Sequence, residues 1–335
     1  MVFCLRQNPI HKTILEVRAL KVVVTGGAGF IGSHLCARLL KEGHNVLCVD
    51  NLITGSESNI KSLLNNPQFT FLLHDVTKPF PFEVDAIFHL ASPASPVGYL
   101  DNPIATILVN SQGTYQMLEQ ARKQKAMFLF SSTSEAYGDP LVHPQTEEYW
   151  GNVNPVGPRA CYDESKRLGE TLTMEYVRQY HVDARVVRIF NTYGPNSQPN
   201  DGRMIPNFIT QALQDKPLTI YGDGTKTRSI CYVSDLVEGL LLAMFTPETK
   251  GELFNLGNTE EHTVYEYAQA IIRLCEATSE IIYEPARVDD PERRRPDISK
   301  AERVLGWHFK VSMEEGLLRT IEWFSSERTF LSTVS

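Results

Sequence analysis

The feature that most constrains this chain is an apolar run that breaks into regularly spaced glycines. Val22–Thr25 is followed by Gly26, Gly29 and Gly32, and then by a segment with a helical pattern. The first glycine of such a series permits a tight turn out of a strand. The second lets the backbone approach a diphosphate, and the third lets the new helix pack closely. A glycine series alone also fits an ordinary turn, but strand, glycines and helix in this order predict a dinucleotide-binding unit.

A second apolar run supplies an acidic residue at the expected distance. Asn45–Val49 reads as a strand, and it ends in Asp50. A carboxylate in this position accepts hydrogen bonds from the adenine ribose hydroxyls and repels a 2′-phosphate. The sequence therefore predicts NAD, rather than NADP, as the cofactor.

Downstream of the glycines, short apolar runs alternate with helical patterns. The predicted strands are Lys21–Thr25, Val46–Asp50, Phe69–Leu73, Ala86–Leu90, Met127–Ser131 and Arg185–Phe190. The predicted helices are Ile31–Glu42, Pro103–Gln124 and Pro158–Tyr180. This alternation predicts an α/β fold with a doubly wound parallel (Rossmann) sheet.

The regular alternation of apolar runs and helical patterns ends after Asn191. Glycine, proline and asparagine cluster through 194–202, and the elements that follow alternate less regularly. We expect residues 1–20 to be a poorly ordered extension and 21–191 to be the NAD-binding Rossmann domain, rejoined by about 229–258. Residues 192–228 and 259–335 are expected to form a smaller C-terminal α/β lobe that binds the substrate.

Composition narrows the class of protein. The 335 residues include 32 basic and 40 acidic side chains, a net charge of −8, which argues against non-specific binding to nucleic acid. No apolar run approaches the roughly 20 residues that span a bilayer, so we expect no membrane partner. The six cysteines are scattered without metal-ligand spacing, which favours free thiols, no metal and a cytoplasmic location.

One helix carries a candidate catalytic pair. Tyr162 and Lys166 are spaced so that both side chains lie on one helical face, a turn apart. An isolated tyrosine has a pKa near ~10, and a neighbouring cation, from Lys166 or a nicotinamide ring, favours the phenolate. The spacing also fits an amphipathic helix with a buried tyrosine and a solvated lysine. The preceding strand delivers Ser132–Glu135 at its carboxyl end, where ligands of open α/β sheets bind, and this placement favours a catalytic role.

These motifs together resemble the extended short-chain dehydrogenase/reductases that act on nucleotide sugars, and within them the UDP-glucuronate decarboxylases, also called UDP-xylose synthases. The resemblance covers about residues 21–325. The matching segments are Thr25–Gly32, His89–Pro96, Thr133–Gly138, Tyr149–Glu164, Asp289–Pro291 and Arg294–Ile298. It implies a Rossmann domain with a small C-terminal lobe, a UDP-sugar substrate and a homodimer whose interface pairs two helices from each subunit.

The resemblance also implies roles for catalytic residues. Tyr162 would take the proton of the sugar C4 hydroxyl, Lys166 would be its electrostatic partner, and Thr133 would hold the C4 oxygen. After C4 is oxidised by NAD, the sugar is a β-keto acid that can lose CO2, and a general acid must then protonate C5. Ser134, Glu135 and Arg294 match the family at this step. For Thr133–Glu135 the alternative is a turn with capping hydroxyls, and Arg294 could instead bind the diphosphate.

Ligand-binding residues follow from the same resemblance. Asn191, Arg203 and Arg228 match positions around the nucleotide diphosphate and sugar, although surface arginines are the alternative. Asp75 matches a residue near adenine, but aspartate also commonly caps a turn. The expected cofactor-binding residues are Gly26, Gly29, Phe30, Ile31, Gly32, Asp50, Asn51, Thr54, Gly55, Asp75, Val76, Leu90, Tyr162 and Lys166. The expected substrate-binding residues are Asn191, Arg203, Tyr221, Arg228 and Arg294.

Two positions favour decarboxylation over the reactions of neighbouring families. The related 4,6-dehydratases have an aspartic acid in place of Ser134, and the 4-epimerases usually have a small apolar residue in place of Glu135. A non-catalytic sensor of NAD or nucleotide sugar is a third alternative, which the complete catalytic set disfavours. The chain departs from the decarboxylases at Asn196, where arginine is usual, and at Met204–Pro206, so the exact nucleotide and sugar stay open.

Overall fold

The computed structural model describes residues 19–199, 202–286 and 293–334, with side chains described up to residue 326. Most of the expected N-terminal extension, residues 1–18, and the Asp289–Pro291 motif lie outside the described residues. Within the described part of the chain, no helix is long and apolar enough to cross a membrane.

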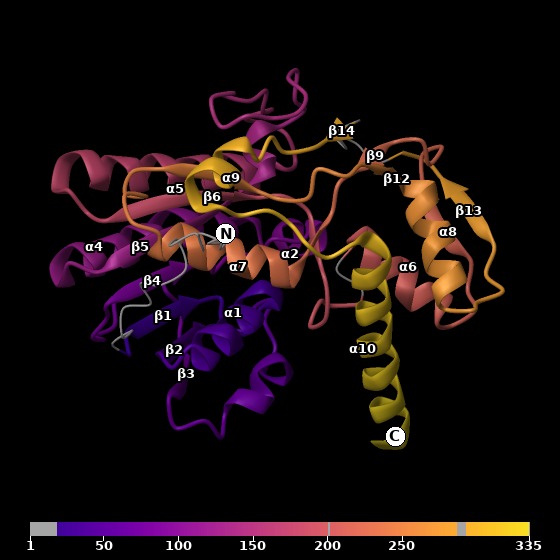
Figure 1. The fold of residues 1–335 in the computed structure, drawn as a ribbon, viewed down its shortest axis with the longest axis horizontal. Coiled ribbons are helices and arrows are strands. Elements are labelled where there is room, and N and C mark those ends of the chain that lie inside the picture. Colours follow the sequence, from indigo (N-terminus) through magenta and orange to yellow (C-terminus); the bar gives the residue numbers. More distant parts are fainter. Residues whose placement is uncertain (1–18, 200–201, 287–292, 335) are drawn as a thin grey trace, which may run out of the picture.

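The core of the protein is one parallel sheet of seven strands (Figure 1). In spatial order the strands are β11 (Leu253–Leu256), β6 (Ala184–Ile189), β5 (Met127–Thr133), β4 (Ala86–His89), β1 (Lys21–Thr25), β2 (Asn45–Asp50) and β3 (Phe69–Leu73). Every pairing between neighbours is parallel. Chain order reverses between β1 and β4, so the carboxyl ends of these strands flank the switch point at which open α/β sheets bind ligands. The predicted Rossmann fold is confirmed.

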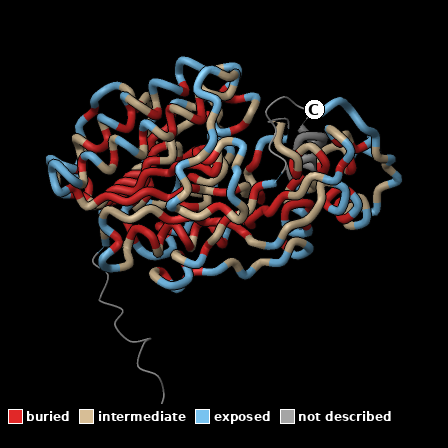
Figure 2. The backbone as a smooth tube through the Cα atoms, turned by 90° about the horizontal axis from the view of Figure 1, so that it is seen from above, coloured by how far each residue is buried: buried red, intermediate tan, exposed pale blue. Residues whose placement is uncertain are grey.

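Helices cover both faces of the sheet. One face carries α1 (Phe30–Lys41) and α7 (Val233–Phe245), which pack against each other. The other face carries α4 (Thr114–Gln124) and α5 (Ala160–Tyr180). The strand interiors are apolar and buried, and Figure 2 shows this buried layer enclosed by more exposed helices and loops.

The predicted helix over Pro103–Gln124 is interrupted. It consists of α3 (Pro103–Leu108), a π-helical turn η3 (Val109–Gly113) and then α4. The Thr114 hydroxyl at the start of α4 donates a hydrogen bond of 2.7 Å to the Asn110 carbonyl inside the π turn. Such π turns commonly occur at functional sites, and this one directs the buried Asn110 side chain toward α5.

A smaller set of elements lies beside the carboxyl ends of the strands (Figure 1). Its helices are α6 (Met204–Ala212), α8 (Val264–Leu274) and α10 (Met313–Val334), whereas α9 (Ser299–Leu305) packs against β11 and α7 of the sheet domain. Its strands are β7 (Thr192–Tyr193), β8 (Leu218–Tyr221), β9 (Thr227–Arg228), β10 (Cys231–Tyr232), β12 (His262–Thr263), β13 (Ile281–Glu284) and β14 (Arg293–Arg294). The remaining elements are α2 (Pro96–Asp101) and the 3₁₀ helices η2 (Glu57–Leu63) and η4 (Ser134–Tyr137).

Candidate active site

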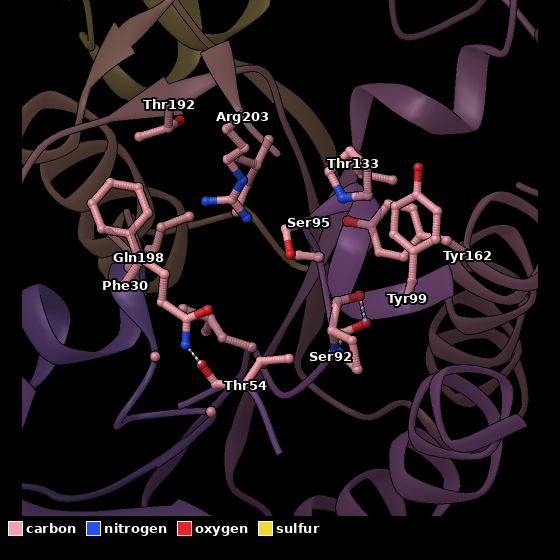
Figure 3. Close-up of a pocket in the computed structure, with 18 of the residues that line it drawn as sticks. Phe30, Thr54, Ser92, Ser95, Tyr99, Thr133, Tyr162, Thr192, Gln198 and Arg203 are labelled. Atoms are coloured by element: carbon pink, nitrogen blue, oxygen red, sulfur yellow. Dashed lines mark hydrogen bonds between the residues drawn. The ribbon is translucent and has the colours of Figure 1, made fainter. Parts of the chain in front are cut away.

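A cavity of about 550 Å³ lies between the sheet and the smaller set of elements (Figure 3). It brings together every site residue that the sequence predicts, from segments far apart in the chain. These residues are Gly26, Gly29, Phe30, Ile31, Gly32, Asp50, Asn51, Thr54, Gly55, Asp75, Val76, Leu90, Thr133, Ser134, Glu135, Tyr162, Lys166, Asn191, Arg203, Tyr221, Arg228 and Arg294.

The glycine-rich turn is shaped for close approach to a ligand. Gly26 has a φ of 71°, which a side chain would strain, and it follows directly on β1. A Cβ atom on Gly32 would lie 2.1 Å from the carbonyl oxygen of Gly26, so only glycine lets α1 begin this close to the strand. The glycines therefore let the backbone at the start of α1 come close to a ligand in the cavity, as a dinucleotide diphosphate requires.

Asp50 closes the next part of the cavity. Its carboxylate accepts hydrogen bonds from the backbone N–H groups of Ala28, at 3.0 Å, and Leu52, at 2.8 Å. Burial raises the pKa of Asp50, while these backbone donors lower it. A Cβ on Gly55 would lie 2.9 Å from the carboxylate oxygens. The Asp50 carboxylate is thereby fixed at the end of β2, where it could accept hydrogen bonds from the adenine ribose of NAD.

Asp75 both caps a turn and lines the cavity, the two roles that the sequence left open for it. Its Oδ1 atom accepts hydrogen bonds from the Thr77 backbone N–H at 3.0 Å and from the Thr77 hydroxyl at 2.8 Å. It therefore caps a turn, and it also lines the cavity beside Val76. The cradle of glycines, Asp50 and Asp75 fits a dinucleotide with an unmodified adenine ribose.

Tyr162 and Lys166 lie on α5 and are both buried. The Lys166 Nζ atom lies 5.9 Å from the centroid of the Tyr162 ring and donates a hydrogen bond of 2.7 Å to the carbonyl oxygen of Ser131. Burial raises the pKa of Tyr162 to about 12, although a hydrogen bond with the Thr133 side chain lowers it. Burial likewise lowers the pKa of Lys166 to about 7. Burial is the largest cause of both pKa shifts, and the expected bias toward a phenolate, which also counts the charge of a nicotinamide ring, stays a prediction.

Glu135 is held between two arginines. Its carboxylate forms ion pairs with Arg294 and with Arg159, and it lies in the first turn of the short helix η4 that follows β5. Burial favours the neutral acid, but the charges of Arg294 and Arg159 outweigh it and hold the pKa of Glu135 below its usual range. Thr133 also caps this turn, because its Oγ1 atom accepts a hydrogen bond of 3.2 Å from the Glu135 backbone N–H. The site therefore presents an ionised carboxylate.

The far end of the cavity is cationic. Strand β14 pairs with β9 so that Arg294 lies opposite Arg228, and both side chains are largely buried. Arg203 is the N-cap residue of α6, and its guanidinium carbon lies 6.0 Å from the centroid of the Phe30 ring. Asn191 anchors the adjoining strand, since its carbonyl accepts the Cys231 N–H at 2.8 Å. Guanidinium groups arranged in this way suit the oxygens of a diphosphate and a carboxylate.

The sequence did not predict several residues that line the cavity, Tyr99 and Arg159, or that lie next to its lining, Asn110 and Asp163. Tyr99 stacks on Tyr162 with ring centroids 5.0 Å apart and an interplanar angle of 9° (Figure 3). Arg159 pairs with Glu135, and the Asn110 amide donates to the Ser165 hydroxyl at 3.0 Å. Asp163 is buried with its Oδ1 atom unpartnered, and burial raises its pKa to about 7. Arg159 and Asp163 lie within the Tyr149–Glu164 motif, but no spacing rule assigned them a contact.

Comparisons with known proteins agree with this geometry. The family described as "NAD dependent epimerase/dehydratase family" matches residues 22–257. The chain is 51% identical over 322 residues to UDP-glucuronic acid decarboxylase 1 of Danio rerio, covering 96% of this chain and 77% of that protein.

Solved structures show the same fold. An epimerase from Methanothermobacter thermautotrophicus has a TM-score of 0.87 and 34% identity, covering 94% of this chain and 95% of that one. UDP-glucuronic acid 4-epimerase from Bacillus cereus, in complex with UDP-glucuronic acid and NAD, has a TM-score of 0.82 and 30% identity. That match covers 92% of this chain and 99% of the epimerase. The predicted use of NAD is confirmed, and the chain belongs to the NAD dependent epimerase/dehydratase family.

Proposed function

We propose that this chain is a UDP-glucuronate decarboxylase, which oxidises C4, releases CO2 and reduces C4 again to give UDP-xylose. The observation that carries this proposal is the Glu135 carboxylate between Arg294 and Arg159, next to Thr133 and Tyr162 in one cavity. Relatives about half identical in sequence carry the name of this enzyme, which supports the same choice.

Oxidation at C4 requires a base and a holder for the oxygen. The Thr133 hydroxyl and the Tyr162 phenol meet at the cavity wall, so Thr133 would orient the C4 oxygen while Tyr162 receives its proton. Lys166 would stabilise the phenolate that must form. NAD, held by the glycine-rich turn and Asp50, would accept the hydride from C4 and later return it, and its nicotinamide would add positive charge beside Tyr162.

The 4-keto sugar is a β-keto acid, and its carboxylate can leave as CO2 because the electrons pass into an enolate. The cavity offers Arg294, Arg159 and Arg228 to hold the three negative charges of the diphosphate and carboxylate. Because Glu135 is ionised between two arginines, it has no proton to give. We infer that Glu135 and Ser134 orient a water that protonates C5, and that the hydroxide left behind takes up a proton from solvent.

Ser134 and Glu135 also disfavour the reactions of the related dehydratases and epimerases. Ser134 is buried and has no acidic proton for a departing C6 hydroxyl, as a dehydratase needs. Glu135 is fixed by its ion pairs, so it occupies space that a 4-keto sugar would need in order to turn over, as an epimerase requires.

Incubation with UDP-glucuronate and catalytic NAD, followed by mass spectrometry, tests the proposal. We expect CO2 and UDP-xylose in equal amounts, without net NADH. Formation of UDP-galacturonate without loss of carbon would establish an epimerase instead. Stoichiometric NADH with a UDP-4-keto-pentose would mean that the last reduction is missing.

We further propose a homodimer formed through the outer faces of α3, α4 and α5. Exposed apolar side chains on these helices support it: Ile104, Ile107, Leu108, Tyr115 and Leu168. Light scattering of wild type and of Ile104→Glu, which should be monomeric, tests this.

We also propose a cytoplasmic location. The five cysteines in the described residues are all free thiols, which supports a reducing compartment, and cell fractionation tests the location.

A further inference from the structure

The segment Pro195–Gln198 follows β7 and reaches across to the Rossmann domain. The Asn196 amide donates a hydrogen bond of 2.9 Å to the Ser33 hydroxyl on α1, and the Gln198 amide donates one of 2.7 Å to the Thr54 carbonyl (Figure 3). The His34 ring is also hydrogen-bonded to the Pro195 carbonyl at 2.9 Å. Three contacts therefore join this short segment to the elements that surround the cofactor end of the cavity.

The segment forms part of the cavity wall. Asn196 and Gln198 both line it, together with Phe30 and Thr54. In Figure 3, Gln198 and Phe30 lie across the pocket from Tyr162. Because Phe30 and Thr54 follow the glycine-rich turn and Asp50, the segment faces the end of the cavity where the dinucleotide would bind rather than the end with Tyr162.

The conformation of the segment is fixed locally. Asn196 has a φ of 65°, in the left-handed region that asparagine tolerates better than most residues. The buried Ser197 hydroxyl donates a hydrogen bond of 2.8 Å to the Gly194 carbonyl. Asn196 also stands at a position where the resemblance leads us to expect arginine.

We propose that Pro195–Gln198 is a latch that retains the dinucleotide throughout the catalytic cycle. The inference rests on the proposed function, in which the hydride removed from C4 must return to the same sugar. If NADH left early, one UDP-glucuronate and one NAD⁺ would yield one CO2, one NADH and one UDP-4-keto-pentose. The proton lost from the C4 hydroxyl would be balanced by the proton gained at C5. The latch prevents this loss by closing the cofactor end of the cavity.

Two substitutions remove the latch contacts separately. Asn196→Gly keeps the left-handed backbone and deletes the bond to Ser33, and Gln198→Ala deletes the bond to Thr54. Gln68→Ala is the matched control, because the Gln68 amide also donates to a backbone carbonyl, that of Gly43 at 3.0 Å, outside the cavity. The dissociation rate of NADH is measured by stopped-flow fluorescence without substrate.

Each latch variant should release NADH about three to ten times faster than wild type, the effect of one lost hydrogen bond, while Gln68→Ala should not change the rate. With UDP-glucuronate, the latch variants should release a larger share of UDP-4-keto-pentose with equal NADH. Unchanged NADH release in both variants, with or without a lower melting temperature, would overturn the latch. Absence of decarboxylation in wild type would overturn the proposed function, yet the NADH rates would still decide the latch.

Discussion

Glu135 and Arg294, 159 residues apart in the chain, form an ion pair inside the cavity. Glu135 belongs to η4, directly after β5, while Arg294 belongs to β14 in the smaller set of elements. The pair therefore joins the two parts of the protein at the reacting end of the site. Because Arg294 is 5% exposed, solvent screens this pair far less than a surface pair.

Replacing Arg294 by methionine should destabilise the protein in a pH-dependent way. The pKa of Glu135 is below its usual value in the folded state, so its contribution to stability is full above the unfolded pKa and is lost as pH falls. At pH 7 we expect Arg294→Met to lower the free energy of unfolding by about 3 kcal/mol, because a buried charge loses a partner. Urea unfolding should show that the difference in the free energy of unfolding between wild type and Arg294→Met becomes smaller from pH 7 to pH 4.

Arg273→Met is the control for this measurement. Arg273 pairs with Glu314 at 2.8 Å, but both side chains are exposed, so its loss should change stability little at any pH. If the free energies of unfolding of wild type and Arg294→Met differed by the same amount at pH 7 and pH 4, the assigned charge state of Glu135 would be contradicted.

Gly32→Ala should abolish tight binding of NAD. The new Cβ would lie 2.1 Å from the Gly26 carbonyl oxygen, so α1 must move away from β1 and the cradle must open. Overpacking of this kind costs about 1–3 kcal/mol. Calorimetric titration with NAD and thermal unfolding measure both effects. Arg38→Ala, on an exposed side of the same helix, should leave NAD binding intact.

The backbone elements around the site were largely predictable. The predicted strands Lys21–Thr25 and Phe69–Leu73 are β1 and β3, because buried parallel strands are short apolar runs with clear ends. The glycine series was predictable for a similar reason, since its spacing expresses a local requirement of the backbone. Roles for the individual site residues and the limits of the two lobes stay predictions.

Other features depend on contacts that no local pattern encodes. Arg159 meets Glu135, and Gln198 meets Thr54, only after the sheet and the smaller set of elements have assembled. The raised pKa of Tyr162 was also unpredictable, because the residue spacing shows the proximity of Lys166 but not the burial of both groups. Tertiary burial, rather than sequence spacing, decides which effect prevails.

Tyr162→Phe should remove turnover while leaving binding of UDP unchanged. The ring, and hence its stacking on Tyr99, would be preserved, so only the hydroxyl that receives the C4 proton is lost. We expect kcat to fall about 10²–10⁴-fold. Steady-state kinetics and calorimetric titration with UDP give the two readouts, and Tyr283→Phe, at an exposed tyrosine, is the control. Full turnover by Tyr162→Phe would remove Tyr162 from the mechanism.

Lys166→Met should impair the enzyme most at acid pH. Burial raises the pKa of Tyr162 to about 12, so formation of the phenolate depends on nearby positive charge, and losing Lys166 should move the acid limb of kcat/KM to higher pH. Lys166 itself has a pKa lowered to about 7, because burial outweighs the opposing charge of Glu170. As pH rises through this value, wild type loses the positive charge that Lys166→Met also lacks.

The ratio of kcat/KM for wild type to kcat/KM for Lys166→Met should therefore decrease from pH 6 to pH 9. Lys166→Arg, which keeps the charge at every pH, should retain the acid limb of wild type. A ratio independent of pH would show that Lys166 positions Tyr162 without acting through its charge.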